Sequence, residues 1–292
     1  MTAMRERFYE LARDALGEDE RVAVVTAQIG ADAFGEHPRH FDVGIREQLM
    51  IGVAAGLALE GYRPVAHSYT PFLVERPYEF LKLDLGHNDL GAILVSIGAS
   101  YDAAREGRTH QAPEDVALVA ALPGWTIHVP GHADELERVF RRALAGDDRI
   151  YIRLSEEENH ARVDGGGFTL LRRGSAGAPL VVAVGPTLQP VLEATAARDI
   201  GVAYLATVRP FPHEELREAL ADGTDVVLVE PYLTGTSASE VGVALRDRPH
   251  RLLALGVPKA EFRHYGTGAE HRAAHGLDAA GISRSLDGFL GA

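Results

Sequence analysis

Short apolar runs alternate along the chain with longer amphipathic segments. Runs with the length of buried strands, rich in Val and Ile, begin at residues 21, 64, 92, 126 and 149. Segments with the apolar spacing of a helix lie between them, at 46–59, 75–85, 114–122 and 133–144. This alternation predicts a parallel sheet that is covered by helices on both faces.

The pattern is interrupted between residues 156 and 179, where the sequence offers EEENH, GGG and GSAGAP without an apolar period. Strand-like runs then resume at residues 180, 200, 224 and 251. We therefore expect an α/β protein with two doubly wound open sheets. The first domain is expected at 1–158, a linker at 159–178, and a second, smaller domain at 179–292.

The composition excludes several classes of partner and site. The chain has 29 Lys+Arg and 42 Asp+Glu, a formal net charge of −13, which repels nucleic-acid phosphates and anionic lipid surfaces. Its longest apolar run, 49–59, is shorter than the roughly 20 residues that span a bilayer. Charged residues at 5–7 replace the apolar stretch of a secretory signal, which favours a cytoplasmic protein. The absence of cysteine excludes disulfides, thiolate zinc sites and cysteine nucleophiles.

Three common functions of α/β proteins lack their sequence motifs. Neither lysine, Lys82 or Lys259, stands in a P-loop, and no GxGxxG follows a predicted strand. A GxSxG nucleophile elbow is also absent. The chemistry must therefore come from histidines, carboxylates or a bound cofactor.

Three segments of the first domain stand out together: FDVGIREQ at 41–48, SYTPF at 68–72 and GRTHQAPED at 107–115. Each alone has an ordinary structural explanation, such as a helix start, core packing or a loop histidine. In this order they resemble the pyrimidine-binding domain of transketolase-like enzymes that depend on thiamine diphosphate.

The second domain extends this resemblance. VVAVGPT from Val181, VRPF from Val208, VEPYLTGTSASEV from Val229 and HYGTGAEHRAAHGLDAAGI from His264 are similar to the transketolase C-terminal domain. The resemblance thus covers nearly the whole chain and implies transfer of a two-carbon ketol unit from a ketose to an aldehyde.

The resemblance also implies roles for individual residues. Glu47 would hydrogen-bond the pyrimidine ring nitrogen N1′, since a buried acid can share its proton with a weakly basic nitrogen. Phe72 would stack on the pyrimidine face, with Tyr69 beside it. His110 would contact oxygen atoms of the substrate near the reacting carbon.

Further polar candidates lie near the expected substrate position. Ser100 and Arg108 are expected to bind substrate, and Arg105 is a second possible cation there.

The diphosphate-binding motif of the family, GDG with a later Asn, is missing. GDD at 146 and NDLG at 88 do not match it. The resemblance therefore implies a partner subunit that carries this motif and holds the diphosphate and its Mg²⁺ or Ca²⁺. No metal ligand is expected in this chain, and the expected assembly is an α2β2 heterotetramer with two sites.

Two departures from the family bear on the substrate. Glu156, in the run 156–158, stands where an arginine that binds substrate phosphate is expected. A second expected arginine falls at Glu75 or Pro77, with Arg76 displaced by one position. Two interpretations stay open: the acidic run is a solvated linker start, or it disfavours a phosphorylated substrate and favours a neutral or amino-bearing one.

Alternative functions also remain open. FDVGI and EQ, with Tyr69 and Phe72, are closest to deoxyxylulose phosphate synthase, whereas GIRE and THQ also fit transketolases. The β subunit of a 2-oxoacid dehydrogenase E1 component shares the layout and an equivalent glutamate, but THQAPED favours the transketolase side. A non-catalytic scaffold subunit is the alternative of another class, against which the joint presence of Glu47, Phe72 and His110 argues.

Overall fold

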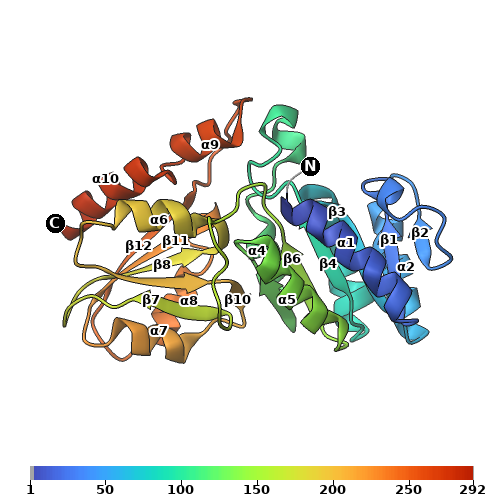
Figure 1. Ribbon diagram of the computed structural model, residues 1–292, viewed down its shortest axis with the longest axis horizontal. Helices are drawn as coiled ribbons and strands as arrows, with labels where there is room; N and C mark the ends of the chain where they lie inside the picture. Colours follow the sequence, from blue (N-terminus) through green and yellow to red (C-terminus); the bar gives the residue numbers. More distant parts are fainter. Residues whose placement is uncertain (1–2, 292) are drawn as a thin grey trace.

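A computed structural model describes residues 3–291 of the chain. The first two residues of the expected first domain and the last residue of the second lie outside this range. Two α/β units lie side by side, the N-terminal one coloured blue to green and the C-terminal one yellow to red (Figure 1).

The first unit is built on a seven-stranded sheet in the order β10-β5-β6-β4-β3-β1-β2. All neighbouring strands are parallel except β10, which runs antiparallel to β5. The strands are β1 (Val22–Thr26), β2 (His40–Asp42), β3 (Arg63–Tyr69), β4 (Ile93–Ile97), β5 (Trp125–His128), β6 (Arg149–Arg153) and β10 (Thr207–Arg209).

Successive side chains of these strands point to opposite faces, and each face is covered. Val22 and Val24 pack with α1 (Ala3–Glu18) and α5 (Ala133–Leu144), which cross one face in Figure 1. The next residue, Val25, belongs to a second core cluster, on the other face. That cluster includes residues of α2 (Glu47–Leu59) and α4 (Asp115–Ala120), as well as of a π-helical turn at Pro71–Glu75. The central strands are therefore buried on both faces and largely apolar, in agreement with the sequence pattern.

The segment predicted as one helix at 75–85 is less regular. A short helix α3 (Tyr78–Phe80) is flanked by the π-helical turns Pro71–Glu75 and Leu81–His87.

The second unit has a five-stranded sheet in the order β12-β11-β8-β9-β7, parallel except for β7. Helices α6 and α10 pack on one face, and α7 and α8 on the other. Its elements are β7 (Phe168–Arg172), β8 (Leu180–Val184), α6 (Leu188–Ala194), β9 (Gly201–Leu205), α7 (His213–Leu220), β11 (Asp225–Leu233), α8 (Ala238–Ala244), β12 (Arg251–Val257), α9 (Gly268–Ala274) and α10 (Ala279–Leu290). The predicted fold class is confirmed.

The expected linker at 159–178 contains structure. Strand β7 lies within it and pairs antiparallel with β9 at the edge of the second sheet. Because an edge strand is covered on fewer sides, four of its five residues are only partly buried and one is exposed, and the apolar signal is weak.

The two units are also joined more closely than two separate domains. Strand β10 comes from the second half of the sequence but pairs with β5 of the first sheet. One apolar core cluster runs from Trp125 and Val129 of the first unit to Leu180 and Phe211 of the second. Among residues 3–291, no helix is both long and apolar enough to cross a membrane.

Candidate active site

Four residues singled out from the sequence lie together at the carboxyl ends of the parallel strands of the first sheet. Tyr69 ends β3, Phe72 follows in the next turn, and His110 lies in the loop after β4. The ring centroids are 6.1 Å apart for Tyr69 and Phe72, 5.4 Å for Tyr69 and His110, and 5.0 Å for Phe72 and His110. This edge is where open α/β sheets bind ligands.

Glu47 begins α2, and its side chain is only 4% exposed. The preceding loop is held by Asp42, whose carboxylate accepts the backbone N–H groups of Gln28 and Gly44. Gly44 adopts φ 67°, a conformation that favours glycine. The positive end of the helix dipole favours a carboxylate at the position of Glu47.

The position of Tyr69 depends on a glycine of the neighbouring strand end. A Cβ at Gly98, which has φ 68°, would lie 2.3 Å from Cδ1 of Tyr69. The Thr70 hydroxyl donates to the carbonyl of Ile97 at 2.9 Å and ties the two strand ends together. Glycine and threonine thus fix the aromatic ring at the sheet edge.

Arg76 connects Glu47 to this ring cluster. Its Nη1 donates to Glu47 Oε1 at 2.9 Å, and its Cζ lies 3.9 Å from the centroid of the Phe72 ring. The sequence showed Arg76 only as a cation displaced by one position from an expected phosphate contact. Its pairing with Glu47 was not predicted, because residues 29 positions apart give no local signal.

Arg108 is engaged within its own loop. Its guanidinium donates to the carbonyl of Gln111 at 2.6 Å and to Glu114 at 2.8 Å. Both contacts hold the turn Arg108–His110 from which His110 projects. Arg108 also lies 3.8 Å from a carboxylate oxygen of Glu261 in the second unit, and its expected role in substrate binding stays a prediction.

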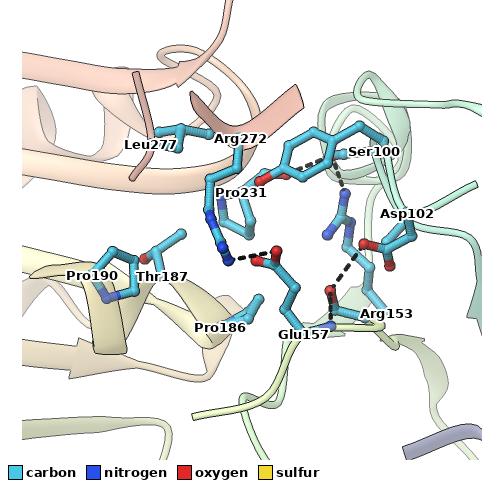
Figure 2. A pocket seen from close by; sticks show the side chains of 13 residues that line it. Ser100, Asp102, Arg153, Glu157, Pro186, Thr187, Pro190, Pro231, Arg272 and Leu277 are labelled. Carbon is cyan, nitrogen blue, oxygen red and sulfur yellow. Dashed lines mark hydrogen bonds and ion pairs between the residues drawn. The ribbon is translucent and has the colours of Figure 1, made fainter. Parts of the chain in front are cut away.

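Ser100 lies on the boundary between the two units (Figure 2). Its hydroxyl, in a residue that is 3% exposed, donates to the carbonyl of Pro231 and accepts a hydrogen bond from Arg153. Arg153 also donates to Asp115 at 2.8 Å. Ser100 therefore belongs to a buried polar network at this boundary, and its expected role in substrate binding stays a prediction.

The structure places Glu156 and Glu157 of the acidic run in different surroundings. Glu157 forms an ion pair with Arg272 of α9 and so bridges the two units (Figure 2). Glu156 instead lines a cavity of about 310 Å³ together with Tyr69 and Arg105. The cavity is closed on the other side by Gly266, Thr267 and Gly268 of the second unit.

This cavity is rich in carboxyl groups. Asp102 and Glu106 line it with Glu156, and Arg105 is the cation among its lining residues in the described chain. Burial raises the pKa of Asp102 to about 7, although its carboxylate accepts the backbone N–H of Glu156 at 2.9 Å. Burial also raises the pKa of Glu156.

Within residues 3–291, no group of three or more His, Cys, Asp or Glu side chains is arranged to hold a metal ion.

The sequence matches the family of the transketolase pyrimidine-binding domain over residues 4–160. It is 47% identical to an uncharacterized 33.6 kDa protein in the fasciation locus of Rhodococcoides fascians, over 99% of this chain and 96% of that protein. It is 31% identical to a 6-deoxy-6-sulfo-D-fructose transketolase subunit of Clostridium sp. (strain MSTE9), over 87% and 84% of the two chains. A 1-deoxy-D-xylulose-5-phosphate synthase of Magnetococcus marinus is 33% identical, but this chain covers 43% of its length.

Solved structures agree with the sequence matches. A split gene transketolase, described as an inactive β4 tetramer, superposes with a TM-score of 0.81 at 25% identity, over 97% of this chain and 96% of that one. Transketolase from Campylobacter jejuni has the same fold, with a TM-score of 0.81 at 18% identity over 99% of this chain and 46% of that one.

Proposed function

The chain belongs to the transketolase family, and from this premise we propose that it is one subunit of a split thiamine diphosphate-dependent transketolase. The complete enzyme would transfer a two-carbon ketol unit from a ketose to an aldehyde. The observation that carries the proposal is the buried Glu47 beside the Tyr69, Phe72 and His110 rings. The match along nearly the full length of a split gene transketolase chain supports a subunit of this kind.

The side chains present fit the pyrimidine half of the cofactor. Glu47 offers a buried carboxyl group, and Phe72 offers the face of its ring. The two are close enough for the guanidinium of Arg76 to contact both at once. An aminopyrimidine needs the same two contacts, one along its polar edge and one across its face. When bound, thiamine diphosphate supplies a carbanion that attacks a carbonyl carbon and then stores the negative charge.

This chain's residues then have separate tasks. Glu47 holds a proton at N1′ of the pyrimidine, and Phe72 orients the ring. His110, packed edge-on against both Tyr69 and Phe72, donates to oxygen atoms of the substrate. Arg108 keeps the turn that carries His110 in place.

The substrate is proposed to lack a phosphate group. The cavity beside Tyr69 combines Asp102, Glu106 and Glu156 with Arg105, so a dianionic phosphate would meet more carboxyl groups than guanidinium groups. A neutral or amino-bearing sugar or aldehyde suits this lining. Turnover of phosphorylated and unphosphorylated aldoses by the assembled enzyme tests the point, and a strong preference for the phosphate would contradict it.

A second chain is needed for the diphosphate. We propose a partner with the GDG motif and a later Asn, which holds the diphosphate and Mg²⁺ or Ca²⁺ in an α2β2 assembly. Co-expression of the two chains with thiamine diphosphate and magnesium is expected to yield a stable complex that transfers ketol units. Failure of the two chains to co-purify would contradict the assembly.

Glu47→Gln in this complex tests the catalytic assignment. We expect turnover to fall by about 10²- to 10⁴-fold because proton transfer at N1′ is lost, with circular dichroism unchanged. Glu60→Gln, an exposed carboxylate at the other end of α2, is the matched control and retains activity. Near-normal turnover of Glu47→Gln would reject the assignment.

Similarity to a deoxyxylulose phosphate synthase at 33% identity supports a second candidate function. That reaction would use pyruvate as donor and release CO₂. Activity with pyruvate and an aldehyde, without activity with a ketose donor, would select it. Acyl transfer from a 2-oxoacid to lipoamide would instead select the E1-type function.

A further inference from the structure

Arg76 makes two contacts at once with the residues that we assign to the cofactor. Its guanidinium donates to Glu47 and lies flat enough over Phe72 to bring Cζ within 3.9 Å of the ring centroid. The Glu47 side chain is 4% exposed, whereas that of Arg76 is 46% exposed. One side of the guanidinium is thus enclosed by the site, and the other is open to solvent.

These contacts are the ones that an aminopyrimidine would use. A guanidinium and an aminopyrimidine are both flat, and each can form a hydrogen bond with a carboxyl group through one nitrogen that lies in its plane. Phe72 accepts either group on its face, one by cation–π attraction and the other by stacking. A guanidinium and an aminopyrimidine that use the same Glu47 oxygen and the same face of Phe72 exclude each other.

We propose that Arg76 occupies the pyrimidine position of the unloaded subunit and has to swing out when the cofactor's ring enters. The inference rests on the proposed function. It assigns Arg76 a role that the sequence did not suggest: it neutralises the buried Glu47 carboxylate and keeps the Phe72 face covered until the ring binds.

The attachment of Arg76 allows such an exchange. Its backbone is held on both sides, because its N–H donates to the Pro71 carbonyl at 3.1 Å and its own carbonyl accepts from Gln48 at 3.3 Å. Its long side chain, in contrast, pairs with one carboxylate among residues 3–291, that of Glu47, and is 46% exposed. The side chain can therefore leave by rotation alone, without a change in the helical turns around it.

The consequence is a reduced apparent affinity for the ring. A ligand that binds only when Arg76 is out has its affinity lowered by the fraction of time the position is open. Removing the guanidinium removes this competition, although it also leaves Glu47 without its cation. The loss of the competition raises the affinity for an aminopyrimidine. The loss of the cation leaves the buried Glu47 carboxyl group free to form a hydrogen bond with the ligand.

The test is a titration of the full chain with 4-amino-2-methylpyrimidine, followed by NMR shifts or calorimetry. We expect Arg76→Ala to bind this probe at least about tenfold more tightly than the unmodified chain. Arg76→Gln is a second variant that keeps more of the side-chain volume. Arg46→Gln is the matched control, because it removes an equal charge next to Glu47. The Arg46 side chain donates a hydrogen bond to the Val43 carbonyl and to no carboxylate of residues 3–291.

Two results would overturn the proposal: equal affinities in the presence and absence of Arg76, or no detectable binding by any of the variants. The gain must also disappear in the Glu47→Gln, Arg76→Ala double variant, since the probe needs the carboxyl group. If the assembled enzyme transfers no ketol unit while the probe still binds more tightly to Arg76→Ala, the proposed function is wrong and the proposal for Arg76 is not.

Discussion

Two arginines of this molecule pair with buried carboxylates, yet their surroundings differ. Arg153 is 1% exposed and pairs with the fully buried Asp115, whereas Arg76 is 46% exposed and pairs with Glu47. Both also lie against an aromatic ring, Arg153 at 5.4 Å from that of Tyr232 and Arg76 at 3.9 Å from that of Phe72.

The difference lies in how completely each pair is enclosed. Oδ2 of Asp115 also accepts from the Tyr151 hydroxyl, and Arg153 also donates to Ser100, whose hydroxyl reaches the Pro231 carbonyl of the second unit. The Glu47 pair lacks such a closure on its solvent side. A buried carboxylate whose cation is also buried stabilises the fold, and one whose cation is half exposed is available for a ligand.

The largest expected effect follows from opening the enclosed pair. Arg153→Met leaves Asp115 buried without its cation, and we expect unfolding free energy to fall by about 3 to 5 kcal/mol. Urea denaturation measures this change. Arg141→Gln, an exposed arginine in an i,i+4 pair with Glu137, is the control and should change it by under about 0.5 kcal/mol. Comparable losses in the two variants would remove the distinction between enclosed and open pairs.

Asp102 extends the comparison to a buried carboxyl whose hydrogen-bond partners in the described chain are the Ser155 hydroxyl and the Glu156 backbone N–H. Burial raises its pKa to about 7, so the folded protein binds this proton more tightly than the unfolded chain does. Its contribution to stability is therefore lost as the pH rises from about 4 to 7, by at most about 1.4 kcal/mol per pH unit.

Asp102→Asn isolates this effect. The unfolding free energy of the unmodified chain, measured relative to that of the variant, is expected to decrease across the same pH interval. A difference that is constant from pH 4 to 8 would show that Asp102 titrates normally.

Ser100→Ala probes the serine that joins the enclosed network to the second unit. The change leaves the Pro231 carbonyl and one Arg153 donor without a partner, and we expect a loss of about 1 to 3 kcal/mol in urea denaturation. In the assembled enzyme the KM for substrate should stay unchanged. A raised KM with unchanged stability would support the substrate-binding role that the sequence analysis expects for Ser100.

The smallest effect is expected at the open pair. Arg76→Gln should lower the unfolding free energy by under about 1 kcal/mol, because the guanidinium is half exposed and water can replace its contact with Glu47. Thermal and urea unfolding measure this change. A loss as large as that of Arg153→Met would mean that Arg76 is a structural residue.

Several features could be predicted from the sequence because they depend on local or repeated signals. The apolar runs predicted the central strands. The motifs in their order singled out Glu47, Tyr69, Phe72 and His110, which the structure places at one edge of a sheet. Their assigned roles stay predictions until the variants are measured.

Other features carry no such signal. Helix α1 was not predicted. The three-residue strands β2 and β10 were not predicted either, since a strand that short has too few residues to show a period. The partners of Ser100 and Arg76 come from residues 131 and 29 positions away, so only the folded chain shows which hydrogen bonds those side chains make.

Strand β10 has a consequence for how the molecule can be divided. The loop between β6 and β7 connects the two units covalently. Strand β10 and the shared apolar core hold the units together without this loop, by hydrogen bonds and packing. A polypeptide cut between Gly165 and Gly166 should therefore stay assembled as two fragments. Separately expressed pieces that meet at this position are expected to complement each other, with the second fragment lending a strand to the sheet of the first.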